Sequence, residues 1–310
     1  MNPLYLGLEL GVATFFVVAA WLALRRGRLP FLELVSAAAF GLLLEEGDQL
    51  IFQTYHYSPD FVLAVDRAPL AIGLTWALII AGAMRITDAL GVRRRYAPFV
   101  DSILAISLDL AFDAIAIRMG LWTWRELGLE QGWFGVPAGN FFAWLFVTFG
   151  FSLLTRWLRD ASHGRPQLEW LQLLVPIPAF VLLLLPLWPF GELRPLIDPA
   201  PGSGWQMFLV ALAAFAAVAG WGVWGPDRAP PDGASEAMLD LRLAFATRLA
   251  IHLLFLGAFL ATGIVTSAPA LGVVALLMLG VELPLAVMTR RRTSAPGPSP
   301  VQPRGATVEG

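Results

Sequence analysis

The feature that most constrains this chain is a series of long apolar segments separated by short polar ones. A helix that crosses a bilayer needs about 20 predominantly apolar residues. Nine segments qualify: Pro3 to Leu24, Pro30 to Gln53, Pro69 to Ile86, Pro98 to Met119, Val136 to Leu158, Leu168 to Trp188, Trp205 to Trp224, Leu243 to Ile264 and Pro269 to Met288. Only 14% of the residues are charged, whereas soluble domains are about one quarter charged. We therefore expect an all-α, polytopic membrane bundle of about nine transmembrane helices.

Arginines follow the first, third, fifth and ninth segments, whereas the opposite ends hold few. The clusters are Arg25, Arg26 and Arg28; Arg85 and Arg93 to Arg95; Arg156, Arg159 and Arg165; and Arg290 to Arg292. Loops rich in arginine stay on the cytoplasmic side of a membrane. This distribution predicts an N-terminus outside and a cytoplasmic C-terminus, in a bacterial inner membrane.

Polar residues divide the chain unequally, because the last four segments are nearly free of them apart from His252 and Glu282. We therefore predict a transmembrane domain over residues 1–292, with a functional half at about 1–158 and a scaffold half at about 168–289. Four prolines between Pro176 and Pro189 predict a bend in the sixth segment. Residues 293–310, rich in Pro, Ser and Gly, predict a disordered tail.

Acidic residues of the second and fourth segments fall at one depth, in the expected outer half of the membrane. Glu45 shares a helical face with Asp48, and Asp109 shares one with Asp113, because residues three or four apart are neighbours on a helix. The same half holds Glu9, Glu46, Trp76, Asn140 and Trp144. A charge at the bilayer centre costs about 2.5–3.5 kcal/mol on insertion scales and marks a functional site by default. The pattern predicts an acidic, tryptophan-walled pocket, closed by the aromatic segment Leu121 to Val136.

Simpler explanations compete for individual side chains. A carboxylate near a segment end can reach interfacial water or pair with Arg118. Glu33 and Asp101 lie near the expected cytoplasmic ends, where snorkelling or capping explains them. Asn140 closely follows Pro137, so a role at the helix start competes with binding of substrate or water.

The inventory of reactive side chains favours acid chemistry without a metal or cofactor. A buried carboxyl group favours its neutral form and suits a general acid, and tryptophan faces stabilise cations. Such a site could protonate an alkene in a lipid-soluble substrate and protect the carbocation. The chain has no cysteine and no lysine, which excludes thiolate ligands and Schiff bases. The histidines, His56, His163 and His252, are too dispersed for a multi-histidine iron centre.

Other cofactor and partner classes find little support. No glycine-rich nucleotide-binding pattern occurs, which disfavours nicotinamide, flavin and ATP chemistry. The pair Asp109-x-x-x-Asp113 could bind magnesium as in membrane prenyltransferases, but no cluster of arginines lies nearby to hold a diphosphate. We expect no metal, no cofactor and no nucleic-acid partner.

Two sets of motifs stand out in sequence order. The first comprises Leu108-Asp-Leu-Ala-Phe-Asp113, Gly120-Leu-Trp-Thr-Trp124, Gly132-Trp-Phe-Gly-Val-Pro137 and Asn140 to Trp144; the second comprises Glu45-Glu-Gly-Asp48, Tyr55-His-Tyr57 and Pro69 to Trp76. Over about Leu32 to Leu154 the chain resembles the carotenoid biosynthesis protein family, integral membrane proteins that include carotenoid hydratases. It differs at Asp113-Ala114, where the family commonly has Asp-Pro, and at the small residues Ala138 and Gly139 after Pro137.

The resemblance implies hydration of a terminal carbon–carbon double bond in an acyclic or monocyclic carotenoid, which gives a tertiary alcohol. Asp113 or Asp109 would donate the proton, and Glu45 or Glu46 would position or activate water. The expected substrate-binding residues are Trp76, Trp122, Trp124, Asn140, Trp144, Tyr55, Tyr57 and Asp48. A lycopene-type cyclase, a proton-coupled transporter and a non-catalytic partner of carotenoid enzymes are the alternatives. The expected partners are the carotenoid, membrane lipid and other carotenoid enzymes.

Overall fold

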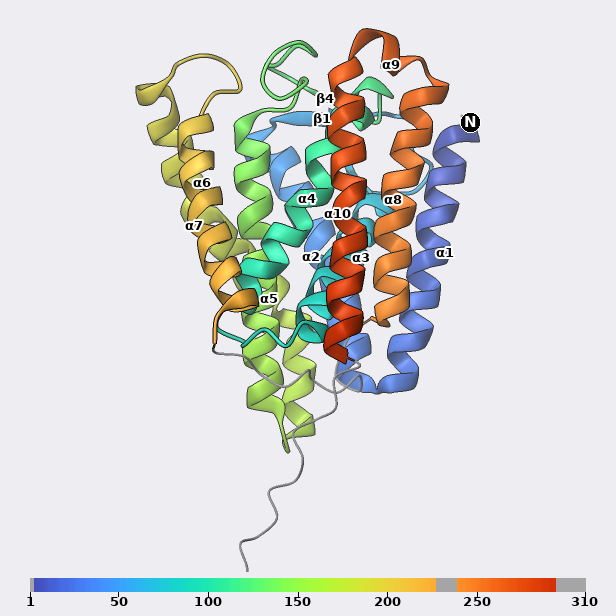
Figure 1. Ribbon diagram of the computed structural model, residues 1–310, viewed down its shortest axis with the longest axis vertical. Helices are drawn as coiled ribbons and strands as arrows, with labels where there is room; N and C mark the ends of the chain where they lie inside the picture. The colour runs from blue at the N-terminus through green and yellow to red at the C-terminus, as the bar shows by residue number, and fades with distance from the viewer. Residues whose placement is uncertain (1–2, 227–238, 294–310) are drawn as a thin grey trace, which may run out of the picture.

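The protein is a nearly all-α bundle, described here from a computed structural model over residues 3–226 and 239–293 (Figure 1). Within those residues, nine helices have 20 to 25 residues each. They are α1 (Pro3–Arg26), α2 (Arg28–Gly47), α3 (Leu70–Ala89), α4 (Ala97–Arg118), α5 (Ala138–Ser162), α6 (Pro176–Ile197), α7 (Trp205–Trp224), α8 (Leu241–Ala261) and α10 (Pro269–Thr293). Helices α2 to α5 lie centrally, with α1 and α8 on one flank and α6 and α7 on the other (Figure 1).

Seven of these helices are long and apolar enough to cross a membrane by length and composition, and the chain is therefore a membrane protein. They are α1, α3, α5, α6, α7, α8 and α10. The other two long helices of the described residues carry more charge: α2 holds Glu33, Glu45 and Glu46, and α4 holds three aspartates. A count of nine spans, and the side of the membrane that each end faces, stay predictions.

Three of the expected segments differ from the observed elements. The second ends as an α-helix at Gly47 and continues as a short π-helical stretch, η1 (Asp48–Phe52). The sixth is interrupted, because a 3-10 helix, η2 (Pro166–Leu174), precedes α6, whose first residue is a proline. Proline suits that position because the first turn of a helix needs no N–H donor. The eighth ends at Ala261, before the short α9 (Ile264–Ser267).

At the C-terminus, α10 continues through Thr293. The rest of the predicted tail, residues 294–310, lies outside the described residues.

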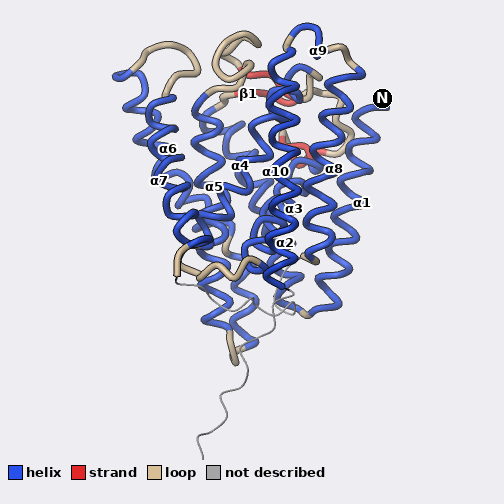
Figure 2. The backbone as a smooth tube through the Cα atoms, in the orientation of Figure 1, coloured by secondary structure: helices blue, strands red, loops and turns tan. Residues whose placement is uncertain are grey.

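In the part of the chain that the structure describes, two short antiparallel pairs of strands accompany the helices (Figure 2). Strand β1 (Tyr55–Tyr57) pairs with β4 (Trp122–Trp124), with Tyr55 opposite Trp124 and Tyr57 opposite Trp122. Strands β2 (Ala64–Val65) and β3 (Ala68–Pro69) form the second pair. Because alternate residues of a strand share a face, the four aromatic side chains of β1 and β4 lie on one face of their sheet.

Helices α2 and α3 touch through their backbones at two glycines. A Cβ atom at Gly41 would lie 2.6 Å from Cβ of Trp76 and 2.9 Å from the carbonyl oxygen of Gly73. Glu45 follows Gly41 by one turn and therefore lies on the same face of α2. This close approach brings Glu45 to the tryptophan of α3.

A buried network of charges joins α2, α3, α4 and α5. Arg156 of α5 pairs with Asp88 of α3 and, at 3.1 Å, with Asp101 of α4, while Arg159 pairs with Glu33 of α2 at 2.7 Å. Glu33 and Asp101 have 0% exposed surface. The expectation that snorkelling or capping explains these two acids is therefore wrong, because burial leaves arginine pairing as their means of compensation.

A second buried cluster joins α8 and α10 to α4. Arg248 binds Glu282 at 2.7 Å and donates to the carbonyl oxygen of Leu104 at 2.8 Å. His252 lies 3.2 Å from the same glutamate. The two polar residues that stood out in the last four expected segments thus contact each other, and Glu282 also pairs with Arg248.

Candidate functional site

A cavity of about 1130 Å³ opens among the described helices and is lined by ten of the twelve predicted site residues. The ten are Glu45, Asp48, Tyr55, Tyr57, Trp76, Asp113, Trp122, Trp124, Asn140 and Trp144. The two predicted residues outside the lining are Glu46 and Asp109. The chain therefore gathers residues from α2, η1, α3, α4, α5 and the β1–β4 sheet around one space.

The side chain of Asn140 bridges the two aspartates of α4. Its Nδ2 atom lies 3.0 Å from Oδ2 of Asp109 and 2.6 Å from Oδ2 of Asp113. Asp113 reaches the cavity, whereas Asp109 is 0% exposed behind it and its Oδ1 atom has no partner among the described residues. Pro137 is the N-cap of α5 and Asn140 makes no side-chain capping bond. The Asn140 amide therefore binds the two carboxyl groups and does not cap α5.

Glu45 receives hydrogen bonds on both carboxylate oxygens. Nε1 of Trp76 donates to Oε1 at 2.6 Å, and the hydroxyl groups of Tyr55 and Tyr57 both donate to Oε2. Burial, together with the nearby Glu45, raises the pKa of both tyrosine hydroxyls well above their usual range. The tyrosines therefore remain neutral donors, and the three donors hold Glu45 as an acceptor.

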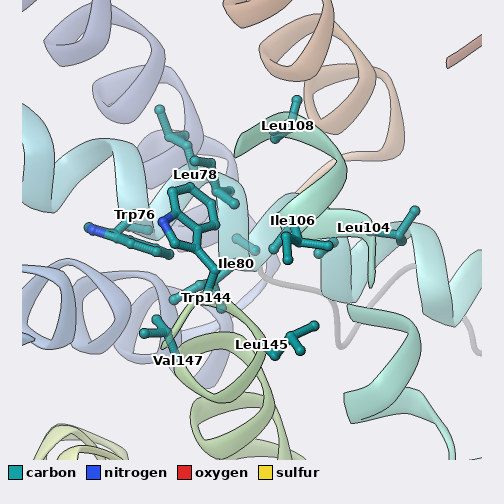
Figure 3. Packing of buried hydrophobic residues seen from close by; sticks show 14 of the residues in the cluster. Trp76, Leu78, Ile80, Leu104, Ile106, Leu108, Trp144, Leu145 and Val147 are labelled. Atoms are coloured by element: carbon teal, nitrogen blue, oxygen red, sulfur yellow. The ribbon is translucent and has the colours of Figure 1, made fainter. Parts of the chain in front are cut away.

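Aromatic rings surround the space between the two acidic groups. The rings of Trp76 and Trp144 lie 4.3 Å apart between centroids, and both project into the buried core between α3 and α5 (Figure 3). Phe112 lies 5.5 Å from Trp144, and Trp122 lies 6.1 Å from Tyr57. Phe112 was not among the predicted site residues, although it lies between the two aspartates in the sequence. Ring faces of this kind can stabilise a cation within about 6 Å.

Glu46 of α2 and Asp48 of η1 accept hydrogen bonds from the segment between α2 and α3. Oε2 of Glu46 accepts the backbone N–H groups of Arg67 and Ala68, each at 3.2 Å. Asp48 accepts the hydroxyl of Thr54 at 2.7 Å while it lines the edge of the cavity. The structure therefore directs the Glu46 carboxylate of α2 to the loop before α3 and does not bring it to the cavity.

Arg118 fastens the aromatic loop that follows α4. Its guanidinium group donates to the carbonyl oxygen of Phe134 at 2.5 Å and to that of Leu129 at 2.8 Å. Its ion pair in the described residues is with Glu130, at 3.8 Å. The alternative in which Arg118 neutralises the membrane acids is therefore wrong for Asp109 and Asp113.

Helices of the second half of the chain also form walls of the cavity. The lining includes Phe180, Leu183, Leu187, Phe190 and Arg194 of α6, and Thr247, Ile251, Leu254 and Phe255 of α8. All of these except Arg194 and Thr247 are apolar, so a search for polar residues in the sequence does not find them. The division into a functional and a scaffold half stays a prediction, but the cavity extends beyond the first half.

Comparison with known proteins adds the family. A model of the family described as carotenoid biosynthesis protein matches residues 3–190, from α1 to Phe190 of α6. The matched region is more than half of the chain and extends past the Leu32 to Leu154 stretch in both directions. No curated protein and no solved structure matches the chain. By the extent of that match, the chain belongs to the carotenoid biosynthesis protein family.

Proposed function

We propose that this protein hydrates a terminal carbon–carbon double bond of an acyclic or monocyclic carotenoid. Family membership supports a role in carotenoid biosynthesis. The reaction type rests on one observation. Asp113, which Asn140 links to Asp109, lines the same aromatic cavity as Glu45, which is held by hydrogen bonds.

Asp113 is the proton donor in this proposal. It lines the cavity, whereas Asp109 lies behind it. Two carboxylates that share one amide donor repel each other when both are ionised, so the pair is expected to hold one proton. If both carboxyl groups were ionised, the buried Oδ1 atom of Asp109 would have no donor, so the pair shares one proton, and Asp113 delivers it because Asp113 reaches the cavity.

The reaction begins when the Asp113 carboxyl group transfers its proton to the less substituted carbon of the terminal double bond. The π electrons form the new C–H bond, and the positive charge moves to the more substituted carbon. The faces of Trp76 and Trp144 and the negative charge of Glu45 stabilise this cation.

Water then attacks the cation and forms the C–O bond of a tertiary alcohol. The proton that the water loses passes to the Glu45 carboxylate. Transfer of this proton from Glu45 to Asp113, both of which line the cavity, restores the starting protonation states before the next turnover. The net reaction adds one water to one alkene and needs no oxidant or reductant.

The rival functions diverge from hydration after the protonation step. A lycopene-type cyclase would lose a proton from carbon, and its product would have the mass of its substrate. A proton-coupled transporter would need a polar path across the protein, and the mainly apolar helices around this cavity favour a lipid substrate.

The proposed location is a bacterial inner membrane, which the enzyme crosses nine times. The β1–β4 sheet would lie on the outer side, because the arginine-rich ends of α1 and α10 lie at the opposite end of the bundle (Figure 1).

Expression in a carotenoid-producing bacterial host tests the proposal. Wild-type protein should convert a supplied acyclic carotenoid to a product heavier by one water. Asp113→Asn should abolish the product, and Asp109→Asn should reduce it. Asp60→Asn, at an exposed loop residue, is the matched control and should retain wild-type activity. Absence of any change in every supplied carotenoid would contradict the enzyme, and unchanged product in both aspartate variants would contradict the acids.

A further inference from the structure

One part of the cavity, which we call the arm, is bordered by residues of α1, α3 and α8. Its walls include Gly7, Gly11 and Phe15 of α1, Ile79 of α3, and Thr247 and Leu254 of α8. From Pro3 to Phe15, both of which line the cavity, α1 covers about 18 Å at about 1.5 Å per residue. The arm is therefore long enough for an extended chain and not only for a reacting end.

The arm opens sideways through the surface of the bundle. Gly7 and Gly11 line the cavity and are also exposed, and a Cβ atom at either would meet nothing within 4 Å. Leu254 across the gap is 45% exposed. Since α1 and α8 are both apolar enough to cross a membrane and form one flank of the bundle (Figure 1), this opening faces lipid.

One polar group in this arm lacks a partner. The side chain of Thr247 lines the cavity and is 4% exposed, and its Oγ1 atom has no hydrogen-bond partner within the described residues. A threonine hydroxyl in a helix usually bonds to the backbone one turn earlier. A buried hydroxyl left unpaired is unfavourable unless a ligand or water satisfies it.

We propose that this arm is a lateral substrate channel. It admits a long polyene lipid from the bilayer between α1 and α8, holds the chain remote from the reacting end, and binds an oxygen substituent of that chain through Thr247. The inference rests on the proposed function, because it assumes that the reacting end lies at Asp113.

The other side of the cavity is less suited to a hydrocarbon chain. Along α6 the lining runs to Arg194, and nearby it includes Arg125 and Glu126. Charged side chains at that end favour water over a polyene. Gly191 of α6 also lines the cavity and has open space around its Cα, so it provides a matched probe for this side.

Binding, measured apart from turnover, tests the channel. Protein in nanodiscs would be loaded with lycopene, or with a lycopene derivative that carries one hydroxyl group, and the retained pigment per protein measured by absorbance. Gly11→Leu and Gly7→Leu should lower retention roughly fivefold or more, because an added side chain occupies the channel. Gly257→Leu is the matched control, since that glycine is exposed on α8, has open space and does not line the cavity. Leucine in place of glycine raises helix propensity, so folding should be preserved.

Thr247→Val should lower retention of the hydroxylated pigment roughly two- to tenfold and leave lycopene unchanged, because one neutral hydrogen bond is lost. Equal retention by Gly11→Leu, Gly7→Leu and Gly257→Leu would overturn the channel, as would a loss confined to Gly191→Leu. Retention of neither pigment by the wild type would overturn both the channel and the proposed function. Normal retention without any product would contradict hydration alone and leave the channel standing.

Discussion

Replacing Glu45 by glutamine would remove a charge from the cavity while preserving the shape of the side chain. The glutamine amide can keep its three contacts if its oxygen faces Nε1 of Trp76 and its NH2 group faces the two tyrosines. Tyr55 and Tyr57 would then rotate their hydroxyls and accept where they now donate. The variant should therefore fold, since weaker neutral hydrogen bonds are offset by the absence of a buried charge.

The effect on the reaction should be larger. A carboxylate about 4 Å from a cation contributes about 4 kcal/mol at an effective dielectric constant of about 20. Loss of that term corresponds to a decrease in rate of two to three orders of magnitude at roughly 1.4 kcal/mol per factor of ten. Distance and residual water reduce this value, so about a hundredfold is the expected loss.

Product formed per folded protein in membranes of the carotenoid-producing host measures the effect, with thermal unfolding as the check on folding. Glu46→Gln is the matched control, because that neighbouring carboxylate binds backbone N–H groups outside the cavity. Activity of Glu45→Gln equal to that of Glu46→Gln would refute the assignment of Glu45 as counter-ion to the cation.

Three further predictions concern other contacts. Asn140→Ala removes two amide hydrogen bonds to the aspartate pair, and at about 1.5–3 kcal/mol for bonds to charged groups it should lower the rate of product formation about tenfold or more. Gly41→Val should destabilise the protein by about 1–3 kcal/mol in thermal unfolding, because its Cβ would overlap Trp76, whereas Gly280→Val, where space is open, should show a much smaller loss. Arg156→Leu removes the arginine partner of the buried Asp101 and one of the two arginine partners of the buried Asp88, and should cost about 3–5 kcal/mol of unfolding free energy; a melting temperature unchanged from wild type would contradict the buried network.

The helices were predictable because bilayer thickness imposes a length that hydropathy reports directly. Seven expected segments recur as candidate spans, with shifted ends, and α2 and α4 have the expected length. The interruption before α6 was not predicted. The 3-10 helix η2 ends at Leu174 and α6 begins at Pro176, but hydropathy stays high across this boundary and gives no sign of it. Hydropathy also gives no signal for the pairing of β1 with β4, whose strands are three residues each.

The candidate site was predictable in membership but not in geometry. Depth alone indicated that Glu45, Asp113 and Asn140 lie together, and all three line the cavity. Depth could not separate Glu45 from Glu46, because adjacent residues on a helix point in directions about 100° apart and only packing decides which faces the cavity. Spacing likewise gave no sign that Arg159 binds Glu33, since that contact depends on how α2 and α5 meet.

The origin of the oxygen atom in the product tests the central claim most directly. Membranes that contain the wild-type protein would be supplied with lycopene in water enriched in oxygen-18, and the product analysed by mass spectrometry. Hydration through a carbocation predicts a product heavier than lycopene by one water, with the heavy oxygen in its hydroxyl group, and predicts its loss in Asp113→Asn. A product with the mass of lycopene, or one whose oxygen does not come from water, would contradict hydration.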